Sequence, residues 1–246
     1  MIFFPNTVGV TQFTVVVQGR QVTFSGVPDT NCPGMPNSDC IDQDFAVFVY
    51  NAGTSISLAA PTNLVATVVT STSVALTWSP VLGADHYEIS RRTSGGYIVI
   101  DNTTTAASFT DSSASSGTAY LYRVRALDPA NNPGAYSNAD LATTVVFTDD
   151  PLTAGSTIVL AQHMYELRQA VNAVRSTAGL GSATFTDDPL IGIAVKAVHV
   201  QELRSNLDAA RSTLGLGALT YSDDPIAGGQ TIVKAAHVAE LRAGVR

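Results

Sequence analysis

Lysine is nearly absent from this sequence, and positive charge of either kind is scarce. Lys196 and Lys234 are the only lysines among 13 basic residues, which face 20 acidic ones, so the net charge is −7. The other basic residues are arginines scattered along the chain, and they cannot form the continuous basic face that follows a phosphate backbone. This charge balance argues against nucleic acid and against anionic membrane surfaces as partners.

Long apolar runs and catalytic motifs are also missing. A bilayer span needs about 20 apolar residues, and no such run occurs, so we expect no membrane span. The first residues, MIFFPNTVGVTQ, have neither the positive region nor the cleavage site of a recognisable signal peptide. Without a Gly-rich phosphate loop, a nucleophile elbow or an HExxH motif, we predict a non-enzyme with no catalytic residue, no metal and no cofactor.

Cysteine is limited to Cys32 and Cys40, which lie on either side of the turn-forming segment PGMPNSD. Such a turn can bring the two Cβ atoms within bonding distance, so we predict a local disulfide, with two unpaired thiols as the alternative. A disulfide implies an oxidising compartment, and we therefore expect an extracellular or cell-surface location. The acidic loop over residues 29–44 is a possible Ca²⁺ site, although a solvated loop is the simpler interpretation.

The chain divides into three regions of different pattern. Residues 1–58 contain short alternating apolar stretches and predict a small β segment that needs a neighbour to complete its core. Residues 60–146 contain short strands separated by turn residues at regular spacing, which is typical of a β-sandwich. Residues 147–246 change to a helical period. The predicted fold class is mainly β, with a C-terminal α-helical repeat region.

The middle region resembles the fibronectin type III family, an immunoglobulin-like β-sandwich. The resemblance rests on the stretches APTNLVATVVTSTSVALTWSPV, HYEISRR and TAYLYRVRALD. It implies that Trp78 anchors the core from the second strand, and that Tyr120 is the tyrosine-corner residue whose hydroxyl bonds backbone a few residues upstream. The residues that it places in the sandwich core are Trp78, Tyr120, Tyr122 and Val124.

The last region contains three copies of one unit, with the boundaries 147–184, 185–220 and 221–246. The units begin FTDDPL, FTDDPL and YSDDPI, and each continues into a segment with the pattern HxxELR. The third copy is shorter than the others. Similar units occur in large secreted or surface proteins of environmental bacteria, and this resemblance implies no established biochemical role.

Each unit predicts one amphipathic helix. In the second unit an apolar stripe runs through Val200, Leu203, Leu207, Ala210 and Leu214, which share one helix face. A Gly-Leu-Gly sequence then ends the helix. The Asp-Asp-Pro sequence suits a helix start, with the second Asp as N-cap and Pro in the first turn. Each unit is therefore expected to have a short turn or helical hook at DDP, a connection, and then the one main helix. Such helices bury each other's stripes, because one alone cannot.

Polar residues at fixed positions in the three units admit four interpretations: metal binding, acid–base catalysis, recognition of a glycan, or structural joints between units. One His and no Cys per unit is too few ligands for a typical zinc site. An active site is normally made once, and these helices lack an aromatic stripe for sugar stacking. We therefore favour joints in which His bonds a carboxylate or carbonyl of the DDP segment, and Glu and Arg pair with the adjacent unit. The predicted joint residues are Asp150, His163, Glu166, Arg168, Asp188, His199, Glu202, Arg204, Asp224, His237, Glu240 and Arg242.

The undersized β segment and the short third unit suggest that one chain could complete the next. We accordingly predict a non-catalytic structural protein that self-associates head to tail into an open homopolymer, as in a bacterial surface filament or adhesive appendage. Possible further partners are surface glycans or other cells. The alternative is an accessory carbohydrate- or cell-surface-binding region of a larger secreted enzyme or adhesin.

Overall fold

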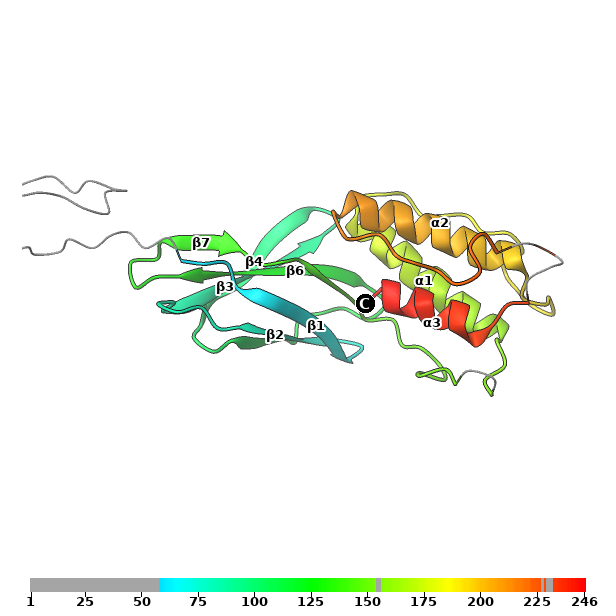
Figure 1. Ribbon diagram of the computed structural model, residues 1–246, viewed down its shortest axis with the longest axis horizontal. Coiled ribbons are helices and arrows are strands. Elements are labelled where there is room, and N and C mark those ends of the chain that lie inside the picture. Colours follow the sequence, from blue (N-terminus) through cyan, green and yellow to red (C-terminus); the bar gives the residue numbers. More distant parts are fainter. Residues whose placement is uncertain (1–57, 154–155, 227, 229–231) are drawn as a thin grey trace, which may run out of the picture. The chain divides into compact units, whose positions relative to one another are not determined.

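The computed structural model describes residues 58–246 except 154–155, 227 and 229–231. It contains a β-sandwich followed by three helices, which confirms the predicted fold class (Figure 1). The predicted β segment, the Cys32–Cys40 disulfide and the acidic loop over residues 29–44 lie outside the described residues.

The sandwich consists of two antiparallel sheets. Strands β1, β2 and β5 form the smaller sheet, and β4, β3, β6 and β7 follow one another in the larger sheet, where β8 also pairs with β6. The strands span Thr62–Thr70 (β1), Ser73–Ser79 (β2), His86–Thr93 (β3), Gly96–Thr104 (β4), Ser108–Asp111 (β5), Ala119–Leu127 (β6), Pro133–Tyr136 (β7) and Asp140–Thr143 (β8).

Alternation along the strands fills the space between the two sheets. Trp78 on β2 is buried, and its ring meets the ring of Tyr87 edge-on at 5.2 Å. On β6, Tyr120, Tyr122 and Val124 point into the same core. The hydroxyl of Tyr120 accepts a hydrogen bond of 2.8 Å from the backbone N–H of Ser115, five residues upstream. This is the geometry of a tyrosine corner, which ties the loop before β6 to the core.

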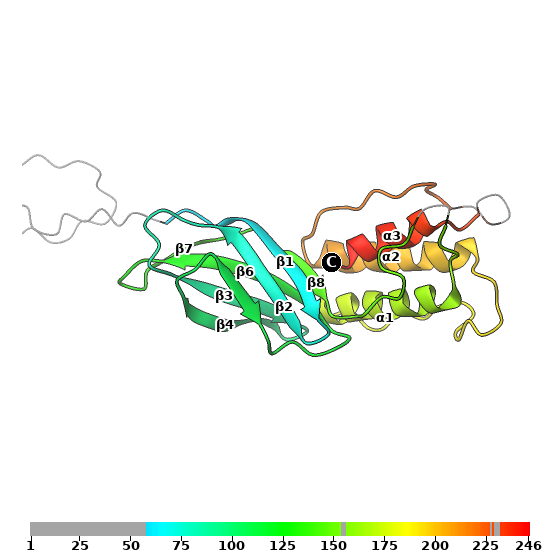
Figure 2. The same cartoon turned by 90° about the horizontal axis from the view of Figure 1, so that it is seen from below.

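Helices α1 (Ala161–Thr177), α2 (Ala197–Thr213) and α3 (Ala235–Gly244) all run toward the sandwich, and each contacts the other two (Figures 1 and 2). The predicted stripes face the centre of this group, where the five residues of the second unit are buried beside their counterparts in the other units. The helices therefore form a closed group of three, in which the first and last units touch, and not a linear stack.

The glycines end the helices as predicted, whereas the second Asp of DDP is not an N-cap. Gly179 and Gly215 adopt the left-handed conformation, with φ of 78° and 73°, just after α1 and α2. The next N–H, that of Leu180, reaches back to the carbonyl of Arg175 at 2.8 Å, as in a Schellman motif. At the starts, the main helix follows the DDP turn after a connection, as predicted, and α1 begins at Ala161, ten residues after Pro151. The DDP segment itself forms a bend or turn that is not helical, so the prediction that its second Asp is an N-cap is wrong.

The helical group is joined to the sandwich by a continuous apolar cluster. Leu121 and Leu141, on the outer face of the larger sheet, belong to the same cluster as Val171 and Val174 of α1. At the end of α1 the hydroxyl of Thr177 donates a hydrogen bond of 2.6 Å to the carbonyl of Ala119 on β6. The described residues from 58 to 246 accordingly form one compact unit.

Candidate functional site

Each unit begins with a loop that we call the DD loop, comprising residues 147–150, 185–188 and 221–224. The first Asp of every DD loop adopts the left-handed conformation, with φ between 50° and 52° for Asp149, Asp187 and Asp223. Aspartate tolerates this region better than most residues because its short polar side chain can bond locally. The turn directs the carboxylate back to the helix of its own unit.

In each unit this carboxylate is hydrogen-bonded to a buried histidine. Asp149 lies 3.1 Å from Nε2 of His163, and the same pair recurs at 3.1 Å for Asp187 and His199 and at 3.0 Å in the third unit, between Asp223 and His237. All three histidine side chains are fully buried. Sequence reasoning chose the second Asp of DDP for the joint and missed the first, although both are present in all three copies.

The other ring nitrogen of each histidine caps the helix. The backbone N–H of Leu160 donates to Nδ1 of His163 at 3.2 Å, and Lys196 and Lys234 donate in the same way in the other units. The histidine side chain thus accepts a hydrogen bond from the backbone N–H of the N-cap residue, which is the role that glutamate has in a capping box. Because Nδ1 accepts a hydrogen bond, Nε2 carries the proton and donates it to the carboxylate. Both nitrogens are engaged, and neither is left as a metal ligand or as a general base.

The glutamate of HxxELR holds the DD loop of its own unit. Both the backbone N–H and the hydroxyl of Thr148 donate to Glu166, at 2.9 and 2.5 Å. Thr186 makes the same bonds to Glu202, and Ser222 makes them to Glu240. Histidine and glutamate therefore fasten each DD loop to the helix that follows it.

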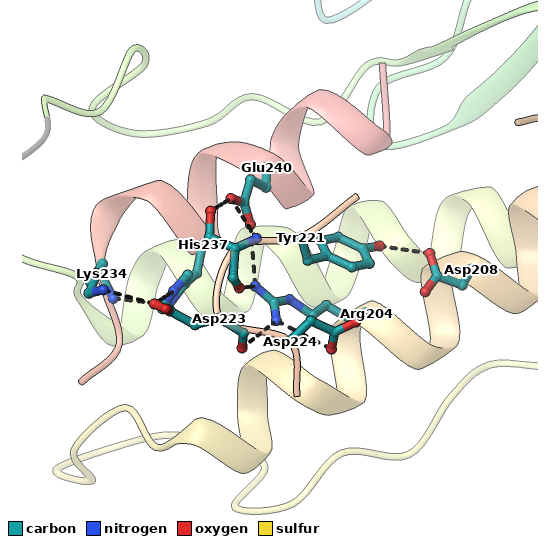
Figure 3. A network of polar contacts seen from close by, with 9 residues as sticks. Arg204, Asp208, Tyr221, Asp223, Asp224, Lys234, His237 and Glu240 are labelled. Carbon is teal, nitrogen blue, oxygen red and sulfur yellow. Dashed lines mark hydrogen bonds and ion pairs between the residues drawn. The ribbon is translucent and has the colours of Figure 1, made fainter. Parts of the chain in front are cut away.

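The arginine of HxxELR holds the DD loop of the next unit. Arg204 donates to the carbonyls of Ser222 and Asp223, at 2.8 and 3.4 Å, and pairs with Glu240 at 3.2 Å (Figure 3). Its guanidinium also lies 4.6 Å from the centre of the Tyr221 ring. The arginine is almost wholly buried, so these contacts replace its hydration shell.

The third unit makes the same joint with the first. Arg242 donates to the carbonyls of Thr148 and Asp149, at 2.7 and 3.0 Å, and pairs with Glu166 at 3.3 Å. It stacks on the Phe147 ring at 4.8 Å. A joint that was expected to be open to another chain is therefore filled within the same chain, and the three units close into a ring.

The joint between the first and second units differs in detail. Arg168 donates to the carbonyl of Thr186 at 2.6 Å and to Asp188 at 3.3 Å. Among the described residues, however, its ion pairs do not include Glu202. The second unit has a connection two residues shorter than the others, so the exception falls on the unit whose sequence differs.

The second Asp of each DD loop has a peripheral place. The carboxylates of Asp150 and Asp224 lie 3.9 and 3.8 Å from the buried arginines of the preceding units in the ring, Arg242 and Arg204. Each is about a third to a half exposed. These residues supplement the joints, whereas the first aspartates are tied to the histidines.

Lysine adds a further contact in two of the three units. The ammonium groups of Lys196 and Lys234 lie 2.7 and 2.8 Å from the carboxylates of Asp187 and Asp223. The pKa of each aspartate lies below its ordinary value. The hydrogen bond from the lysine is the largest cause, and the hydrogen bond from the histidine is the second. The first unit has Leu160 in place of lysine.

The joints consist of hydrogen bonds, ion pairs and stacking contacts within the chain. Within the described ranges, no group of three His, Cys, Asp or Glu side chains is arranged to hold a metal ion. A hollow of about 440 Å³ lies at the start of α2, and Lys196 is its only charged lining residue among those described. None of the described helices is long and apolar enough to cross a membrane.

Comparison with known proteins identifies the sandwich. The model of the fibronectin type III domain matches residues 59–138, which form a domain of that family. A solved structure of an Fn3-like protein from Clostridium thermocellum is 31% identical, with a TM-score of 0.32, over 35% of this chain and 91% of that one. The repeat region lies beyond the family match.

Three curated relatives are enzymes. Poly(3-hydroxybutyrate) depolymerase of Ralstonia pickettii is 39% identical over 106 residues, or 43% of this chain. Alpha-amylase of Niallia circulans and exoglucanase B of Cellulomonas fimi are each 42% identical, over 35% and 39% of this chain. The matches span only 21%, 6% and 8% of these relatives, in the same order.

Proposed function

Because residues 59–138 are a fibronectin type III domain, we propose that the chain is a non-catalytic accessory region of a larger extracellular enzyme that degrades a polymer. The observation that carries this proposal is the kind of relative. All three are named as enzymes of polymer breakdown, and the matched stretch is a small part of each. Such a stretch suits a module that accompanies a catalytic domain.

The geometry of the described residues supports a rigid module. The shared apolar cluster joins sandwich and helices, and the joints lock the three units with buried arginines. A module of this kind can hold a binding surface at a fixed position relative to its neighbours. It needs no moving part and no catalytic group to do so.

The contacts of Arg242 argue against a filament that assembles head to tail through the third unit. Arg242 is already bonded to the DD loop of the first unit, so head-to-tail assembly through the third unit would have to displace Thr148 and Phe147. Self-association would need another surface, such as residues 1–58.

Cosedimentation tests the proposal. The purified chain is incubated with poly(3-hydroxybutyrate) granules, insoluble starch and cellulose, and the soluble products and the pelleted protein are measured. We expect pelleting with at least one polymer, no release of soluble product and a monomer in sedimentation velocity. Open polymers in sedimentation velocity, or catalytic turnover by the chain alone, would overturn the accessory role.

A further inference from the structure

Arginine and tyrosine side chains alternate across the outer face of the larger sheet. The guanidinium carbon of Arg123, on β6, lies 3.8 Å from the centre of the Tyr97 ring and 3.6 Å from the centre of the Tyr136 ring. The two rings come from β4 and β7. Arg123 is thus held between two aromatic side chains, which fixes its position.

Two further arginines extend this stack. The guanidinium carbon of Arg92 lies 5.9 Å from the centre of the Tyr97 ring, and that of Arg125 lies 4.7 Å from the centre of the Tyr136 ring. The strand register explains the order, because Arg92 is paired with Tyr97 and Arg125 with Tyr136 across neighbouring strands. We call these five residues, Arg92, Tyr97, Arg123, Tyr136 and Arg125, the arginine–tyrosine ladder.

Two arginines of the ladder have no acceptor in the described part of the chain. Arg125 pairs with Glu88 at 2.7 Å, whereas Arg92 and Arg123 have no ion pair or side-chain hydrogen bond to any residue that the structure describes. Their Nε atoms are buried without a partner, which is equally true of Arg125 and of four other arginines, so what sets Arg92 and Arg123 apart is that their terminal nitrogens also have no partner among the described residues. The other eight arginines of the described ranges each donate to a carboxylate or a carbonyl: Arg91, Arg125, Arg168, Arg175, Arg204, Arg211, Arg242 and Arg246.

A guanidinium group without an acceptor, on a partly buried surface, is complementary in charge and geometry to a planar oxyanion such as a carboxylate. Its N–H groups form a fork that fits both oxygens of a carboxylate. In Arg92 and Arg123 the buried Nε leaves the two terminal nitrogens to form that fork. Since Arg123 is already held by Tyr97 and Tyr136, it loses little conformational freedom when a ligand binds. If the aliphatic parts of Arg92 and Arg123 served only to cover the sheet, two neighbouring guanidinium groups without acceptors would not be needed.

We propose that the arginine–tyrosine ladder binds the carboxylate groups of an acidic polysaccharide, with Arg123 as the principal contact and Arg92 as the second. The choice of a polysaccharide rests on the proposed accessory role, while the carboxylate follows from the guanidinium fork. A polymer that bears a carboxylate on each sugar can occupy both arginines at once, which raises its apparent affinity above that of a single carboxylate. The net charge of −7 opposes this binding, so the ladder must act locally.

Affinity electrophoresis with polygalacturonate in the gel tests the site on the chain as it stands. We expect the wild-type protein to be retarded at low salt, and R123Q to bind at least tenfold more weakly, since it loses charge-assisted hydrogen bonds. R123K keeps the charge but not the planar fork, and should fall between the two. The matched control is K196Q, which removes one positive charge from the start of α2 and should bind as the wild type does.

A spectroscopic readout separates binding from folding. The Nε–H signals of Arg92 and Arg123 in a ¹⁵N-edited spectrum should shift on addition of polygalacturonate, while those of the buried joint arginines stay in place. No retardation of the wild type, equal weakening by R123Q and K196Q, or binding of dextran sulfate but not polygalacturonate would each overturn the proposal. Pelleting with neutral starch or cellulose, despite such a result, would leave the accessory role standing.

Discussion

Arg242 provides the sharpest test of the closed ring. Its side chain is 3% exposed, donates two hydrogen bonds to carbonyls of the first DD loop and pairs with Glu166, which is itself 5% exposed. Substitution by methionine keeps much of the stem but removes every polar contact. Removing one partner of a buried pair costs about 3–5 kcal/mol, because the carboxylate and the carbonyls lose their donor. We expect R242M to lower the free energy of unfolding by that amount.

Urea unfolding followed by far-ultraviolet circular dichroism measures this change. Arg204 makes the equivalent joint between the second and third units, so R204M should cost about as much as R242M, within about 1 kcal/mol. Arg246 is the control, because it is 44% exposed and pairs with Asp150 at the surface. R246M should cost no more than about 1 kcal/mol. If R242M proves as mild as R246M, the third unit is not joined to the first and the ring is open.

Three smaller changes test other parts of the structure. Tyr120→Phe leaves the N–H of Ser115 without its acceptor and should lower the free energy of unfolding by about 1–2 kcal/mol, measured by urea titration. Asp187 and Asp223 have pKa values below the ordinary one, so their contribution to stability is complete above the unfolded pKa of about 3.9 and is lost as the pH falls through the lower folded pKa. The thermal midpoint should therefore fall less steeply from pH 5 to pH 3 in the double variant D187N/D223N than in the wild type, and equal slopes would contradict this. Leu160→Lys gives the first unit the lysine that the others have and should raise stability by at most about 1 kcal/mol in low salt, an effect that should vanish in 1 M salt.

The strands and the helical stripes could be predicted because they depend on local pattern. Alternation around Trp78 and along β6 marks the inward face of a strand, and the spacing from Val200 to Leu214 marks one face of a helix. The glycines after α1 and α2 are likewise local, since a left-handed residue is needed where the chain leaves the helix. None of these features depends on what the element later packs against.

The repeat motif predicted that joints exist, but their partners were decided by the tertiary structure. In the sequence Arg242 lies in the third unit, far from the first DD loop, and its bonds to Thr148 and Asp149 span 94 and 93 residues. A repeat that stacks in a line and one that closes on itself have the same local pattern. The difference lies in the rotation from one unit to the next, which is set by how the stripes pack in three dimensions.

The sequence by itself determined a fibronectin type III-like sandwich, three amphipathic helices and a buried role for the histidines. Only the tertiary structure decided that Asp149 and its two counterparts bind those histidines and that Arg242 closes the ring. It also decided that Arg123 lies between two tyrosines, with no acceptor among the residues that the structure describes. The physical reason is common to all three. Each depends on atoms brought together by chain direction and packing, and hydrogen bonds and stacking depend on distances of a few ångströms that residue spacing does not fix.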